Sequence, residues 1–118
     1  MKLNALVDLR KKLHQHAEIA HKEIETAKIV TDFLEEQNPD QLIQNIGGYG
    51  LIAKFKGNKE GKTLLFRAEL DALPIAESNS FNYKSKNELW GHKCGHDGHM
   101  AILCGLSDYL KEKDFPGV

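Results

Sequence analysis

Residues 92–110 read HKCGHDGHMAILCGLSDYL, a stretch that joins a polar, histidine-rich segment to an apolar one. From Met100 onward the apolar side chains recur at helical spacing, at Ile102, Leu103, Leu106 and Leu110. Lysines follow at positions 111 and 113, where the helix dipole favours cations. The stretch therefore predicts a polar loop that leads into a helix over 100–110.

Two further helices are predicted near the beginning of the chain. Residues 3–13 carry an apolar stripe at Leu3, Leu6, Val7, Leu9 and Leu13. A second stripe runs from Ile24 to Leu34 and stops at Asn38-Pro39, because the residue before a proline is disfavoured in a helix. Both helices are amphipathic, and the polar residues 14–21 separate them.

Three short segments between these helices change to strand-like patterns. They are Leu42-Ile43, Leu51–Phe55 and Thr63–Ala68; flexible glycine-rich residues 47–50 enter the second, and Gly57–Gly61 resembles a hairpin turn before the third. The third segment is continuously apolar from Leu64 to Phe66, as expected when both faces of a sheet are covered. We therefore expect an α/β fold with helices packed on a mixed β-sheet, and an irregular loop over 75–93.

The composition is that of an ordinary globular protein. The chain has 118 residues, which suits one domain or part of one, with 16 basic and 17 acidic side chains. A net charge of −1 gives no basic field, so no nucleic-acid partner is expected. The charged N-terminus lacks a signal peptide and no apolar run could span a bilayer, so we expect a cytoplasmic protein without a membrane partner, whose two cysteines are free thiols or metal thiolates.

The polar segment GHKCGHDGHMA offers a metal site. Cys94 and His96 flank Gly95, which permits a turn that brings a thiolate and an imidazole together, and both are good zinc ligands. Asp97 or His99 could complete or orient the set. The alternative is a loop with solvated histidines in which Asp97 caps a helix. No second Cys or His pair follows, so a bound metal would need ligands from elsewhere.

A second polar feature is FRAELDALP, residues 66–74. Glu69 and Asp71 are two apart at the predicted end of the third strand and should therefore share one face, where open α/β sheets place ligand chemistry. Such a pair can orient a ligand or hold a proton. Solvated acids at a strand end are the alternative, and Arg67 could pair with either carboxylate.

In order along the chain, four motifs resemble the amidohydrolase branch of the dinuclear metallopeptidases, which includes hippurate, N-acyl-amino-acid and auxin-conjugate hydrolases. They are LRKKLHQHAEIAHKEIETAKIVTDFLEE, GGYGLIAKFKG, LLFRAELDALPI and HKCGHDGHMAILCGL. The resemblance implies that residues 1–118 form the N-terminal segment of a zinc-peptidase-like catalytic domain. Departures from the family pattern are Ala17, where proline is usual, and Glu69, where aspartate is usual.

The resemblance also implies roles for individual residues. Cys94 and His96 would be ligands in a two-metal centre, and the cysteine could bridge the two metals. Glu69 would occupy the place of an acid that orients a metal-bound histidine, Asp71 belongs to the same motif, and Asp97 and His99 would be supporting residues. His14 and His16 belong to a fold signature, for which we favour the simpler interpretation of a solvated helix end.

The implied activity is hydrolysis of the amide bond of small-molecule N-acyl amino acids or similar amides, with two divalent ions of zinc, manganese, nickel or cobalt. The family's general base and remaining ligands would lie after residue 118, so we expect this segment alone to be inactive. One alternative is a non-catalytic remnant, and another is a metal-binding module that uses Cys94, His96 and His99. Unpaired strand edges predict a homo-oligomer or other self-association.

Overall fold

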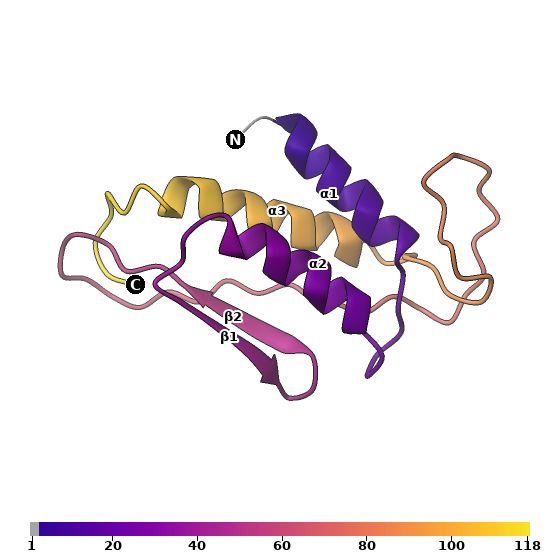
Figure 1. Ribbon diagram of the computed structural model, residues 1–118, viewed down its shortest axis with the longest axis horizontal. Helices are drawn as coiled ribbons and strands as arrows, with labels where there is room; N and C mark the ends of the chain where they lie inside the picture. The colour runs from indigo at the N-terminus through magenta and orange to yellow at the C-terminus, as the bar shows by residue number, and fades with distance from the viewer. Residues whose placement is uncertain (1–2) are drawn as a thin grey trace.

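The computed structural model describes residues 3–118 as three helices beside one β-hairpin (Figure 1). Helix α1 spans Leu3–Gln15 and helix α2 spans Ile24–Glu35. Strands β1, Gln41–Ile46, and β2, Gly50–Lys54, follow, and helix α3 closes the order at His96–Leu110. The two N-terminal helices and the first two strands were predicted, and the predicted arrangement of helices on a sheet is confirmed.

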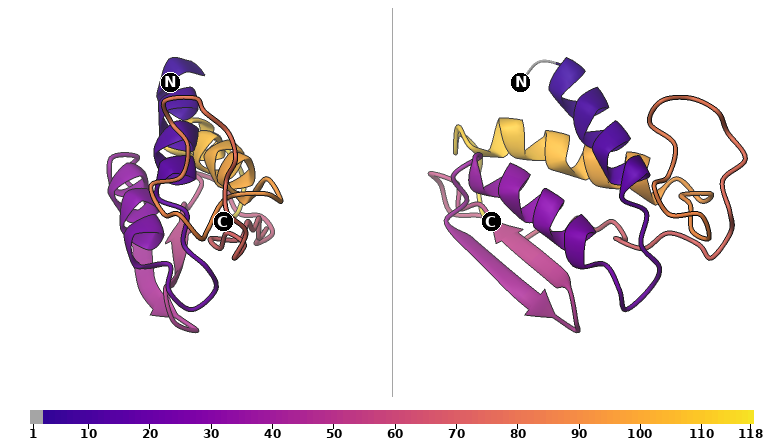
Figure 2. Two further views of the ribbon diagram at one scale, coloured as in Figure 1. Left: turned by 90° about the vertical axis from the view of Figure 1, so that its right-hand side faces the viewer. Right: turned by 45° about the vertical axis from the view of Figure 1, so that its right-hand side comes forward.

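The sheet is an antiparallel pair. Leu42 lies opposite Ala53 and Ile43 opposite Ile52, and the register shifts before Ile46 meets Gly50. Helix α2 lies over this hairpin, as the two views in Figure 2 show. The tight turn therefore falls at residues 47–49, inside the glycine-rich segment predicted to be a flexible entry.

The apolar core lies where α3 packs between the other two helices. It contains Leu9, Leu13, Ile29, Val30, Leu34, Met100, Ala101 and Cys104. Its largest contribution from α1 is Leu13, which is completely buried. No helix among residues 3–118 is long and apolar enough to cross a membrane.

Helix α3 differs from its prediction in both its start and its buried face. It begins at His96 rather than Met100, and its buried side is formed by Asp97, Met100, Ala101, Cys104 and Ser107, whereas Ile102 is 74% exposed. Small side chains let α1 approach closely here, since a Cβ on Gly105 would lie 2.8 Å from Leu6 Cδ1. Close packing with α1 therefore buries the face of α3 that carries small side chains and leaves the larger Ile102 exposed.

The predicted third strand does not form in the described chain. Residues 61–71 run as extended backbone without a paired strand, and Leu64, Leu65 and Phe66 are 66%, 80% and 57% exposed. Its pairing is confined to one end, where the Leu64 N–H donates to the Val118 carbonyl at 2.8 Å. The apolar run indicates a strand that needs neighbouring strands, but no strand among residues 3–118 pairs with it along its length.

The predicted hairpin turn at 57–61 is also wrong. The segment lies against the C-terminal residues, where the Gly57 N–H donates to the Gly117 carbonyl at 2.8 Å. A Cβ on Gly57 would lie 1.9 Å from the Phe115 carbonyl oxygen, so this contact requires glycine. The glycines serve close backbone approach rather than a turn.

Candidate metal-binding site

His96 is the first residue of α3, and its ring is held by Asp71. Nδ1 of His96 lies 2.9 Å from the backbone carbonyl oxygen of Asp71 and 3.1 Å from its Oδ1. Both partners accept, so the proton is assigned to Nδ1. The lone pair of Nε2 is then available, which is the orientation that a metal-binding histidine takes when an acid or carbonyl holds its other nitrogen.

Cys94 stands two residues before His96, at the loop end. Gly95 between them has φ +89°, a left-handed conformation that lets the backbone turn from the loop into α3. The Cys94 thiol is free and exposed. Cys104 is also free, but burial raises the pKa of its thiol to about 12, so Cys94 is the cysteine suited to bind a metal as thiolate.

His99 lies one turn along the same helix. Its ring centroid is 6.0 Å from that of His96, and the residue is exposed. Nε2 of His99 would lie 3.7 Å from a Cβ built on Gly95, which places the ring beside the turn. The structure thus places His99 beside His96, and its supporting role stays a prediction.

Glu69 and Asp71 have different partners. The guanidinium of Arg67 donates to Glu69 Oε1 in an exposed ion pair, whereas Asp71 contacts His96. Both acids line one groove of about 590 Å³ between the β1–β2 turn and residues 67–71. Of the two acids, Asp71 holds His96, and Glu69 is paired with Arg67.

Asp97 neither caps α3 nor faces solvent. It lies inside the first turn, is 1% exposed, and receives Arg10 Nε at 2.9 Å and His14 Nδ1 at 2.7 Å. Burial acts to raise the pKa of Asp97, but the hydrogen bond from His14 and the charge of Arg10 outweigh it and lower the pKa. The position preceding the helix belongs to Gly95, which makes no side-chain cap.

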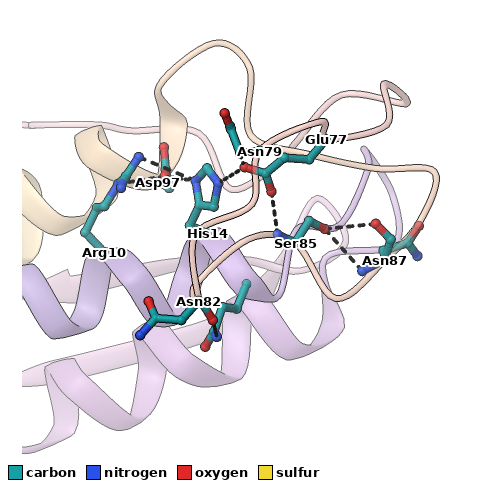
Figure 3. A network of polar contacts seen from close by, with 9 residues as sticks. Arg10, His14, Glu77, Asn79, Asn82, Ser85, Asn87 and Asp97 are labelled. Atoms are coloured by element: carbon teal, nitrogen blue, oxygen red, sulfur yellow. Dashed lines mark hydrogen bonds and ion pairs between the residues drawn. The ribbon is translucent and has the colours of Figure 1, made fainter.

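His14 is buried, so the prediction of a solvated helix end is wrong for this residue. It is 4% exposed, and its Nε2 lies 2.6 Å from Glu77 Oε1 while its Nδ1 faces Asp97 (Figure 3). His16, in contrast, contacts only the Lys12 carbonyl, with Nδ1 at 2.7 Å, in an exposed hydrogen bond. The signal in the sequence was the place of His14 directly after Leu13, four residues beyond Arg10, at the edge of the apolar stripe.

Glu77 connects the 75–93 loop to this buried network. Burial acts to raise its pKa, but hydrogen bonds from the Ser85 backbone N–H, His14 and Asn79 outweigh it and lower the pKa to about 2. Phe81 and Tyr83 from the same loop pack against the His14 ring, with centroids 5.7 and 5.9 Å away. The loop is therefore anchored on α1 through one histidine.

His92 is a second buried histidine that sequence reasoning had left in solvent. It is 7% exposed, and burial lowers its pKa, which favours the neutral ring. Neither ring nitrogen has a hydrogen-bond partner among residues 3–118. Its ring centroid lies 6.1 Å from that of His14, next to the network.

The donor atoms fit part of a metal site. Cys94 and His96 present an accessible thiol and an oriented imidazole, both of which suit zinc and similar divalent ions. Within residues 3–118, however, no group of three or more His, Cys, Asp or Glu side chains could hold a metal ion. The pair therefore fits a metal only if further ligands are supplied from outside these residues.

Known proteins share both sequence and fold with this chain. No family model matches it. A dinuclear metal-binding peptidase of family M20 from Bacillus subtilis superposes with a TM-score of 0.86 and 34% identity, over 92% of this chain and 30% of that one. The chain belongs to the M20 family. A proposed aminohydrolase from methicillin-resistant Staphylococcus aureus superposes with a TM-score of 0.88 and 37% identity. The match covers 97% of this chain and 31% of the S. aureus protein.

Curated relatives of the M20 chain agree. Thermostable carboxypeptidase 2 of Saccharolobus solfataricus is 39% identical over 114 residues, and N-acetylcysteine deacetylase of Bacillus subtilis is 36% identical over 108 residues. Each alignment covers 92% of this chain and 28% of the relative. The predicted kinship with amidohydrolases and metallopeptidases is confirmed, and the chain spans somewhat over a quarter of these relatives' length.

Proposed function

We propose that this chain is the N-terminal segment of a catalytic domain that hydrolyses the amide bond of N-acyl amino acids or similar small amides with two divalent metal ions. The observation that carries the proposal is the contact of His96 Nδ1 with Asp71, which leaves Nε2 available two residues from the exposed Cys94. Relatives that are named as a deacetylase, a carboxypeptidase and a dinuclear peptidase support it. We place the complete protein in the cytoplasm.

In this proposal Cys94 and His96 hold metal, and further ligands come from other residues of the complete protein. Two bound divalent ions, whether zinc, manganese, nickel or cobalt, would polarise the substrate carbonyl and lower the pKa of the attacking water. Asp71 keeps the proton on Nδ1 of His96, so that the opposite nitrogen stays a ligand. Asp97 and His99 support the pair, and Glu69 lines the adjoining groove, where its negative charge is balanced by Arg67.

A metal-binding module without catalysis is the second candidate. The proximity of the His96 and His99 rings, 6.0 Å apart, favours it, because His99 could then join Cys94 and His96 as a ligand. These three side chains do not form a metal-binding group by themselves, so this module also needs a ligand from outside residues 3–118. In that case His99→Ala should lower metal affinity as strongly as His96→Ala. In the hydrolase, His99 only supports the pair, so its loss should cost far less affinity.

The experiment is an assay of the complete protein with N-acetyl amino acids. We expect hydrolysis that a chelator abolishes and added divalent metal restores, and Cys94→Ser and His96→Ala should each reduce kcat/KM by at least about 100-fold. His16→Gln is the matched control, since His16 lies directly after α1 and its side chain contacts only the Lys12 carbonyl. Hydrolysis that survives chelation, or that is unchanged in both variants, would contradict the proposal.

A further inference from the structure

Four charged side chains from three separate segments meet in one cluster, in which only Arg10 reaches solvent substantially. His14 and Arg10 come from α1, Asp97 from the first turn of α3, and Glu77 from the 75–93 loop (Figure 3). The side chains of His14, Asp97 and Glu77 are at most 5% exposed. Charges this well buried persist only when they are paired, so the geometry of the cluster is constrained.

The partners of His14 fix where its protons lie. Nε2 faces Glu77 Oε1 at 2.6 Å and Nδ1 faces Asp97 Oδ2 at 2.7 Å, and carboxylate oxygens only accept. Both ring nitrogens therefore donate, which makes the ring a cation. Arg10 is a second donor to the same oxygen, because its Nε lies 2.9 Å from Asp97 Oδ2. Two cations balance two anions, and the cluster is neutral.

This cluster holds the part of the chain that carries the metal pair. Asp97 is directly bonded to His96 in the first turn of α3, and the ring of His96 is held on its other side by Asp71. Gly95, with its left-handed φ, forms the turn between Cys94 and His96. Without His14, Asp97 keeps only Arg10 as a side-chain partner among residues 3–118, so the first turn of α3, which carries His96, is held by fewer contacts.

We propose that His14 is a positioning residue for the Cys94–His96 pair, acting through Asp97. The proposal rests on the proposed function, because it takes that pair as the metal ligands. His14 touches neither ligand in the structure, so its effect passes through the turn at the start of α3. The loop end of the cluster, Glu77, anchors the 75–93 loop and should matter less for the metal.

The test titrates the complete protein with Co²⁺, because the pair needs ligands from outside residues 3–118, and follows the absorption band that arises when a thiolate binds cobalt. Removal of a group that orients metal ligands typically weakens metal binding 10- to 100-fold, and we expect at least a tenfold loss in His14→Gln and in Asp97→Asn. Glu77→Gln should stay within about threefold of the wild type, and the control His16→Gln should be unchanged. A role confined to stability would lower the unfolding temperature of His14→Gln but leave the cobalt affinity of its folded molecules intact.

A measurement without metal separates this inference from the proposed function. In ¹⁵N spectra of the imidazoles, both nitrogens of His14 should carry protons, and His96 should carry its proton on Nδ1 alone. In His14→Gln the His96 nitrogens should move toward averaged shifts, because the first turn of α3 is held by fewer contacts. If the wild type shows no cobalt–thiolate band, the metal assignment fails and these spectra alone decide the role of His14. Wild-type cobalt affinity in folded His14→Gln, or an unchanged His96 spectrum, would overturn it.

Discussion

His96 Nδ1 lies within hydrogen-bond distance of two oxygens of Asp71, the backbone carbonyl at 2.9 Å and Oδ1 at 3.1 Å. The residues are 25 positions apart in the sequence, so the contact joins the extended 61–71 segment to the start of α3. It holds one ring nitrogen and leaves the other for a ligand, which connects the fold directly to the proposed chemistry.

Asp71→Ala should weaken metal binding by the complete protein about tenfold, since it removes the carboxylate that holds His96. The backbone carbonyl still accepts from Nδ1, so the loss should be smaller than that of His96→Ala. Zinc affinity measured by competition with a chelating dye checks this. Glu69→Ala is the comparison, because Glu69 pairs with Arg67 instead, and an equal loss in both variants would contradict the assignment of Asp71.

Stability should fall in acid because of Glu77. Its folded-state pKa of about 2 lies below the ordinary value of 4.5, so its contribution is fully present above pH 4.5 and is lost as the pH falls toward 2. The shift corresponds to on the order of 3 kcal/mol of unfolding free energy. Urea unfolding between pH 6 and pH 2 measures it, and Glu77→Gln should flatten the dependence. A wild type with equal stability at both ends would refute the role of this carboxylate.

The chain should self-associate through its exposed apolar segment. Leu64, Leu65 and Phe66 lie on extended backbone whose pairing is confined to one end, a combination that favours pairing with another copy. Leu65→Lys should reduce association without unfolding the chain, because Leu65 is 80% exposed. Sedimentation at rising concentration reports the outcome. Ile102→Lys is the control, because Ile102 is similarly exposed but lies on helix α3, where the backbone has no unpaired strand edge. A wild type that stays monomeric at high concentration would rule this out.

The 118-residue chain should not hydrolyse N-acetyl amino acids. Its described residues bring together only part of a metal site, and the rate depends on positioned groups that lie elsewhere. Incubation with substrate and each candidate metal should yield no free amino acid above the background. Metal-dependent turnover by the purified chain, at a rate lost in Cys94→Ser, would show that the site is complete.

The amphipathic helices were readable from sequence because their signal is local. The stripe ending at Leu13 and the one ending at Leu34 predicted α1 and α2, since apolar spacing reports the buried face directly. The start of α3 was missed because its first turn, which begins with His96 and Asp97, is polar and carries no stripe. The segment over 63–68 was predicted as a strand and does not form one. Its apolar run indicates a need for neighbouring strands, but such a local pattern carries no information on whether those strands are present.

Part of the candidate site could also be predicted from the sequence. Cys94 and His96 were named from residue chemistry and resemblance, whereas the contacts of His96 with Asp71 and of Glu69 with Arg67 are seen only in the structure. The buried role of His14 could not be read, because one partner lies 63 positions away in an irregular loop. Long-range pairing of polar groups follows from tertiary packing, and no local pattern encodes it.

The central claim, that Cys94 and His96 bind metal as a pair, is tested most directly by the cobalt spectrum of the complete protein. We predict a thiolate-to-cobalt absorption band that disappears in Cys94→Ser, weakens strongly in His96→Ala, and persists in Cys104→Ala, because the buried Cys104 stays a thiol. A band that survives Cys94→Ser, or a cobalt-loaded wild type without any such band, would contradict the claim.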